Sequence, residues 1–172
     1  MKVLVTYSSL TGNTKKLAEG IYEEIEASTK DIMPINEVTD IEPYDVILVG
    51  YWVDKGGPNS EAAKFLETIK EKAVGLFATL GYWPDTEHAW NSLVNGENLV
   101  KEHNNVIGKY ICQGALSEKI IAMFEKMPKD NPHAITEEKR RRYEIAKQHP
   151  SKADILKAAE LFRERLQVHV SN

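Results

Sequence analysis

Short apolar runs rich in β-branched residues recur along the chain, and segments with helical periodicity separate them. The strongest runs are KVLVTY (2–7), YDVILVG (44–50), AVGLFATLG (73–81) and NNVIGKYICQG (104–114), and KDIMPIN (30–36) is a weaker one. Nearly continuous apolar runs are typical of parallel strands that are covered on both faces. Pro34 cannot donate a ladder hydrogen bond, so it predicts that the weaker strand lies at an edge.

The segments between these runs place apolar residues three and four positions apart, as one face of an amphipathic helix requires. Helices are predicted over 14–28, from Asn59 or Ser60 to about 69, over 85–101 and over 152–167. Strands that alternate with helices form a parallel sheet with right-handed crossovers and helices on both faces. The pattern therefore predicts a single α/β domain over residues 1–172.

Residues 115–150 interrupt this alternation, because they separate the last strand from the last helix by far more than the roughly 2–6 residues common in such connections. Residues 117–127 have a helical pattern, PKDNPH (128–133) reads as a turn, and 136–148 begins with a helix cap at Thr136 and acidic residues after it. We call residues 115–150 the insertion and predict that it is an ordered helical segment within the domain.

Composition and charge narrow the possible functions. The 172 residues suit one domain, and the formal net charge of -4 gives no basic field for nucleic acid. Cys112 is the single cysteine, so a disulfide and a cysteine-rich metal or iron–sulfur site are excluded, and its place in a strand predicts a small core residue. The sequence shows neither a signal-peptide pattern nor the about 20 apolar residues of a membrane span. A cytoplasmic protein without a membrane span is the expectation.

The segment SSLTGNTKKLAEG (8–20) places hydroxyl residues and Gly12 between the first strand and the first helix. Backbone N–H groups at a helix N-terminus, together with hydroxyl donors, can bind a phosphate. The segment lacks the GxxxxGK[ST] pattern of nucleoside-triphosphate loops and the GxGxxG pattern of dinucleotide sites. The residues alone leave two alternatives: a terminal monophosphate held by neutral donors, or a capped turn with no ligand.

YSSLTGNTKKLA (7–18) is similar to the FMN-phosphate loop of the flavodoxins, which follows the first strand. Ser9, Thr11, Gly12, Asn13 and Thr14 match that motif one by one, and Ala18 matches the small residue in the following helix, whereas Thr6 departs from the apolar or aromatic residue common there. The resemblance extends to about residue 114 and resumes in the last helix. It implies a doubly wound flavodoxin-like sheet of five strands in the order 2-1-3-4-5, with FMN at the point where the order reverses.

In this fold the flavin ring would lie across the ends of the third and fourth strands, which are followed by GYWVDKGGPN (50–59) and TLGYWPDTEH (79–88). The resemblance implies one stacking aromatic from each loop, and we expect Trp52 and Tyr82 first, with Tyr51 and Trp83 next. The alternative is that these aromatics only pack the loops. The predicted FMN-binding residues are Ser9, Leu10, Thr11, Gly12, Asn13, Thr14, Tyr51, Trp52, Val53, Thr79, Leu80, Gly81, Tyr82, Trp83 and Asp85. Catalytic residues and metal ligands are not predicted.

Two further segments allow two interpretations each. Gly56 and Gly57 could provide a peptide that flips to hydrogen-bond the reduced flavin, as the resemblance implies, or could form a simple turn. EKRRRYE (138–144) could be a docking surface for an acidic partner, and the favoured interpretation is a solvated helix face with intrahelical Glu–Arg pairs.

Three functions are compatible with these residues, because the fold does not decide among them. The first is an FMN electron carrier between a reductase and a terminal oxidoreductase. The second is an FMN-dependent oxidoreductase acting on a quinone- or protoporphyrinogen-type substrate under the insertion. The third is a protein without redox activity. The complete loop and the paired aromatics disfavour the third. The absence of a nicotinamide-binding fingerprint favours the carrier, whereas the insertion favours the oxidoreductase.

Overall fold

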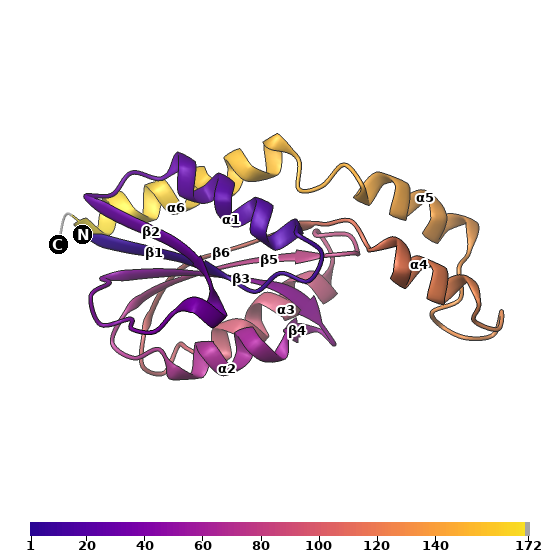
Figure 1. Ribbon diagram of the computed structural model, residues 1–172, viewed down its shortest axis with the longest axis horizontal. Helices are drawn as coiled ribbons and strands as arrows, with labels where there is room; N and C mark the ends of the chain where they lie inside the picture. The colour runs from indigo at the N-terminus through magenta and orange to yellow at the C-terminus, as the bar shows by residue number, and fades with distance from the viewer. Residues whose placement is uncertain (171–172) are drawn as a thin grey trace.

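The computed structural model describes residues 1–170, and a sheet lies between two pairs of helices (Figure 1). The strands are β1 (Lys2–Tyr7), β2 (Thr29–Pro34), β3 (Val46–Asp54), β4 (Gly57–Pro58), β5 (Ala73–Leu80) and β6 (Asn105–Gln113). The helices are α1 (Asn13–Glu24), α2 (Ser60–Thr68), α3 (Glu87–Asn98), α4 (Glu118–Glu125), α5 (Glu137–Ala146) and α6 (Lys152–Val170), with a 3-10 turn at Ile35–Glu37. Helices α1 and α6 cover one face of the sheet, and α2 and α3 cover the other.

The five long strands are parallel and lie in the order β2-β1-β3-β5-β6. This confirms the predicted α/β class and the predicted order, since the numbers differ only because β4 lies between β3 and β5 in the chain. Strand β4 has two residues and pairs antiparallel with the end of β3, which the sequence did not predict. Strand β2 lies at the edge of the sheet, as Pro34 predicts.

The core consists of two apolar layers, one on each face of the sheet. Alternate residues of a strand point to opposite faces, so Val3 and Val5 of β1 pack towards α1 and α6, whereas Leu4 packs towards α2. Phe162 of α6 and Phe77 of β5 meet edge to face, with their ring centroids 6.3 Å apart. Burial on both faces explains why the strand sequences are apolar without alternation. Cys112 is 2% exposed, so its predicted place in the core is confirmed.

Helix boundaries differ from the predicted ones by a few residues at several ends. Helix α1 ends at Glu24 instead of residue 28, because Ile25 has an extended backbone and its side chain turns into the core. Helix α3 is likewise shorter than the predicted 85–101, since Thr86 caps it by accepting a hydrogen bond from Ala89 N–H.

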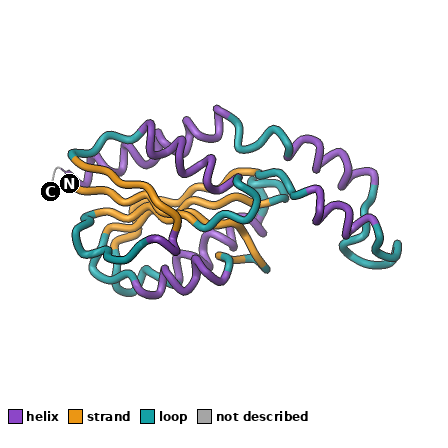
Figure 2. The backbone as a smooth tube through the Cα atoms, viewed as in Figure 1, coloured by secondary structure: helices purple, strands orange, loops and turns teal. Residues whose placement is uncertain are grey.

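The insertion contains α4 and α5, which lie beyond the carboxyl ends of the strands and are joined to the sheet by loops (Figure 2). Ser117 caps α4 and Thr136 caps α5, each through its side-chain oxygen. Among residues 1–170, no helix combines the length and the apolar character needed to cross a membrane.

The chain returns from the insertion to the sheet through a reciprocal cap at the start of α6. Ser151 Oγ accepts from Asp154 N–H, and Asp154 Oδ2 accepts from Ser151 N–H, as in a capping box. His149 Nδ1 lies 2.6 Å from the same carboxylate oxygen. Partial burial by itself raises the pKa of Asp154, but the Ser151 and His149 hydrogen bonds outweigh burial and hold this pKa below its ordinary value. The insertion is thus anchored where α6 begins.

Candidate functional site

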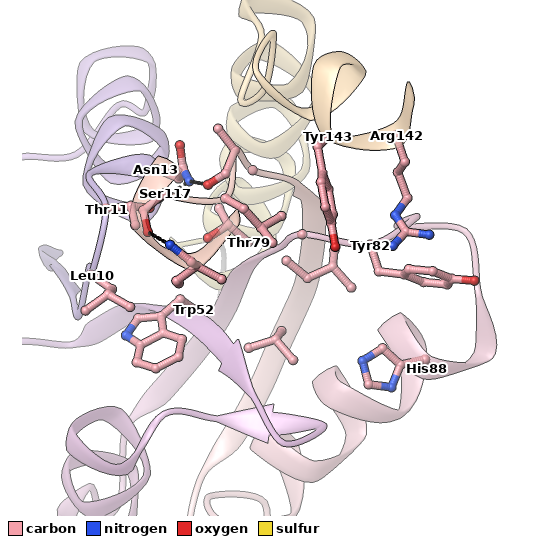
Figure 3. A pocket seen from close by; sticks show the side chains of 17 residues that line it. Leu10, Thr11, Asn13, Trp52, Thr79, Tyr82, His88, Ser117, Arg142 and Tyr143 are labelled. Carbon is pink, nitrogen blue, oxygen red and sulfur yellow. Dashed lines mark hydrogen bonds between the residues drawn. The ribbon is translucent and has the colours of Figure 1, made fainter. Parts of the chain in front are cut away.

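A cavity of about 310 Å³ lies at the carboxyl ends of the parallel strands, where ligands bind in open α/β sheets. Four parts of the sheet side line it: the loop after β1 (Leu10, Thr11, Asn13), the end of β3 (Trp52, Val53), the end of β5 with the loop after it (Thr79, Leu80, Gly81, Tyr82), and α3 (His88). The rest of the lining is Gly114 and six residues of the insertion, Ala115, Leu116, Ser117, Ile120, Arg142 and Tyr143. Figure 3 shows these side chains converging from separate parts of the chain. The volume is within the range of small-molecule sites.

The loop between β1 and α1 places a glycine at the N-cap position of the helix. Gly12 has a φ of +92°, a conformation that side-chain-bearing residues rarely adopt, and as the N-cap residue it has no side chain with which to cap α1. Ser9 Oγ accepts hydrogen bonds from the N–H groups of Gly12 and Lys15, and the second of these lies in the first turn of α1. Ser9 thus provides part of the cap that the capped-turn alternative expects, and an anion would bind to the remaining N–H groups in the first turn of α1.

Two polar residues of the loop connect it to the rest of the site. Asn13 Nδ2 donates to Thr11 Oγ1 at 2.9 Å and to the carbonyl of Ala115, where the insertion begins, at 2.7 Å. The hydroxyl of Thr14 is buried and lies 2.9 Å from the hydroxyl of Thr79. Thr14 thus ties α1 to β5, and Thr11 and Asn13 are the polar residues of the loop that line the cavity.

Of the aromatic residues at and after the ends of β3 and β5, at 50–59 and 79–88, some line the cavity and others do not. Trp52 and Tyr82, the two aromatics ranked first from the sequence, line the cavity. Trp83 and Asp85 lie outside its lining. Tyr51 requires a correction, because its ring is fully buried in the core and its hydroxyl donates to the carbonyl of Ser92 at 3.1 Å. Burial also raises the pKa of this hydroxyl. Tyr51 and Trp52 are consecutive in β3 and so point to opposite faces of the sheet.

The glycine pair lies in a tight hairpin between β3 and β4. Lys55 and Gly56 have φ values of +49° and +80°, which matches the two-residue turn that joins twisted antiparallel strands. The carbonyl of Gly56 accepts a hydrogen bond from Asn95 Nδ2 at 2.8 Å. A flip of the peptide after Gly56 would break this bond, so the structure favours the simple turn.

The insertion adds a wall that the sequence analysis did not include in the site. Arg142 and Tyr143 of α5 line the cavity, and the Arg142 guanidinium lies 4.4 Å from the centroid of the Tyr82 ring. Arg140 and Arg141 are exposed, as the solvated-face interpretation expects; Arg141 pairs with Glu137 of the same helix, whereas Arg140 pairs with Glu125 of α4. This interpretation is wrong for Arg142, which is 8% exposed. The sequence of α5 does contain a pattern for a buried helix face, because Tyr143 and Ala146 are three positions apart.

Comparison with known proteins shows the family to which the chain belongs. The family model of the flavodoxin domain matches residues 4–163, so the chain belongs to the flavodoxin-domain family. The chain is 36% identical over 178 residues to the flavodoxin-like domain-containing protein BilS of Clostridioides difficile (strain CD3), with 99% of each chain covered. It is 23% identical over 148 residues to BilS of Clostridium symbiosum (strain WAL-14163), covering 77% of this chain and 78% of that one.

Solved structures show the same fold. A flavoprotein of Lactobacillus acidophilus in complex with FMN is similar with a TM-score of 0.53 and 22% identity, covering 64% of this chain and 92% of that one. The flavodoxin of Fusobacterium nucleatum bound to flavin mononucleotide has a TM-score of 0.50 and 18% identity, covering 68% of this chain and 72% of that one.

Proposed function

We propose that this protein binds FMN in the cavity and carries electrons between redox partners, a reductase on one side and a terminal oxidoreductase on the other. The observation that supports it best is one cavity that joins the start of α1 to two aromatic side chains, Trp52 and Tyr82. A monophosphate needs the first of these features and a flat ring needs the second.

The residues present fit FMN. The first-turn N–H groups of α1 other than that of Lys15, with Thr11 and Asn13, would hold the phosphate through hydrogen bonds and the helix dipole. Trp52, Val53, Leu80 and Tyr82 would exclude water from the ring. Bound FMN supplies the capacity to accept and release one or two electrons. The protein's own contribution is to bind the ring, orient it and set the charge around it.

The edge of the cavity favours a carrier. Leu10 and Tyr82 both line the cavity and are 61% and 39% exposed, so each presents an apolar surface to a partner at the edge of the cavity. Exposed apolar side chains next to a binding site suit contact with a partner protein.

The second candidate is an FMN-dependent oxidoreductase that acts directly on a quinone- or protoporphyrinogen-type substrate. The observation in its favour is that Arg142 and Tyr143 of the insertion form part of the cavity wall.

Stopped-flow oxidation of the reduced protein by a small quinone separates the two functions. A rate that saturates with quinone concentration favours the oxidoreductase, whereas a rate that stays proportional to it favours the carrier.

The purified protein tests the cofactor directly. We expect it to be yellow or to take up one equivalent of added FMN, and to release FMN on denaturation. Riboflavin should bind more weakly, because it lacks the phosphate that the start of α1 would hold. Flavin absorbance and the quenching of flavin fluorescence measure both affinities. A colourless protein that takes up no FMN would contradict the proposal.

Trp52→Ala is expected to weaken FMN and riboflavin alike, by about tenfold, because it removes a stacking surface that both flavins share. Trp90→Ala is the matched control, since Trp90 lies on α3 outside the cavity lining, is 56% exposed and has Lys109 over its ring. Fluorescence titration of each variant with both flavins is the measurement. Equal behaviour of the two tryptophan variants would mean that Trp52 does not contact the ring.

A further inference from the structure

Arg142 is a buried cation without a counter-ion. Its side chain is 8% exposed, and its Nε is buried without a hydrogen-bond partner. Within residues 1–170 its guanidinium forms no ion pair, and the contacts it makes are with the rings of Tyr82 and Tyr143, 4.4 Å and 5.5 Å from their centroids. Arg142 thus differs from its neighbours Arg140 and Arg141, which both pair with glutamates.

An unpaired buried charge is costly, because the protein interior replaces its hydration poorly. Contact with aromatic rings offsets only part of this cost. The cavity lining contains no aspartate or glutamate, and Arg142 is its one arginine or lysine. In the described part of the protein, Arg142 therefore presents a positive charge to the cavity, and no acidic side chain in the cavity wall neutralises it. An anion bound in the cavity would neutralise this charge.

The position of Arg142 indicates which anion this is. Figure 3 shows Thr11 and Asn13 at one side of the cavity and Arg142, Tyr82 and His88 at the other. A phosphate at the start of α1 would thus lie across the cavity from the guanidinium. The ring system would occupy the space between, lined by Trp52 and Tyr82.

We propose that Arg142 stabilises reduced, anionic FMN relative to oxidised FMN, so that the insertion sets the redox potential of the cofactor; this rests on the proposed function. Reduction adds two electrons from the reductase and one proton from solvent to a neutral ring system, which leaves one negative charge on the ring. A nearby guanidinium that is itself largely buried favours that charge. Arg142 acts on the equilibrium and takes up neither the proton nor the electrons.

Arg142→Met tests this by removing the charge and keeping most of the side-chain stem. The dissociation constants of oxidised FMN and of dithionite-reduced FMN are measured for each protein, together with the two-electron midpoint potential. We expect the preference for reduced over oxidised FMN to fall about tenfold, which lowers the midpoint potential by about 30 mV. Arg142→Lys keeps the charge and should retain most of the preference.

Arg141→Met is the matched control, because it removes an exposed arginine from the same helix and should leave the preference unchanged. Circular dichroism establishes that each variant is folded, and Arg142→Gln replaces Arg142→Met if the methionine variant is not. Equal losses of affinity for oxidised and reduced FMN, or an unchanged potential, would overturn the inference while leaving FMN binding intact. Failure of the unaltered protein to bind FMN would instead overturn the proposed function, and the inference with it.

Discussion

Gly12→Val is expected to weaken FMN binding by about tenfold to a hundredfold and to leave riboflavin binding nearly unchanged. A β-branched residue disfavours the φ of +92° at this position, at a cost of roughly 1–2 kcal/mol. Avoiding that cost would turn the loop and misalign the N–H groups at the start of α1, and a hydrogen bond to a charged group is worth about 1.5–3 kcal/mol. Fluorescence titrations with both flavins measure the difference.

Gly56→Val is the matched control for this change. Gly56 also has a positive φ, +80°, and the nearest atom to a Cβ placed there is 3.9 Å away, so strain in the backbone is the main effect of both substitutions. Gly56 lies in the hairpin between β3 and β4, away from the loop. We expect a similar loss of stability in both variants, with a changed FMN-to-riboflavin affinity ratio only in Gly12→Val. A changed ratio in both variants would mean that the loop does not hold the phosphate.

Phe162→Ala is expected to lower the free energy of unfolding by about 3–5 kcal/mol. Phe162 is fully buried between α6 and the sheet, and its ring meets the ring of Phe77. Gly75 of β5 is packed so closely under this ring that a Cβ there would lie 2.6 Å from it. The surrounding strands cannot close the space that alanine leaves, because the other face of the sheet is also packed. Urea denaturation of the protein without added flavin measures the loss.

Val168→Ala on the same helix provides the comparison, because Val168 is 64% exposed and its truncation should change stability by less than about 0.5 kcal/mol. A Phe162→Ala variant no less stable than Val168→Ala would show that α6 does not pack on the sheet as described.

The consecutive aromatics of β3 show where sequence reasoning reaches its limit. Both residues of the Tyr51–Trp52 pair suit a stacking role by composition, and the strand pattern predicts only that they point to opposite faces. Which face holds the cavity depends on the register of β3 against β1 and β5 and on the packing of α3, whose Ser92 carbonyl binds the Tyr51 hydroxyl. Composition therefore yields two candidates, and long-range contacts place Trp52 at the cavity and Tyr51 in the core.

The arginine triplet of α5 shows the same limit for charge. Arg140, Arg141 and Arg142 are adjacent in sequence, and successive residues of a helix project about 100° apart. Two of them lie towards solvent with glutamate partners, and the third lies against Tyr82. Nothing near α5 in the sequence indicates that the loop after β5, some sixty residues earlier, would lie beside it.

The local pattern of the chain was sufficient for the α/β class, the strand order, the edge position of Pro34 and the core position of Cys112, because burial on both faces of a parallel sheet leaves a clear apolar signature. It was sufficient also for the family, because the loop motif is contiguous. The tertiary structure decided what depends on contacts between distant segments. These are the cavity at the start of α1, the placement of Trp52 at that cavity and of Tyr51 in the core, and the buried positive charge that the insertion brings to the cavity.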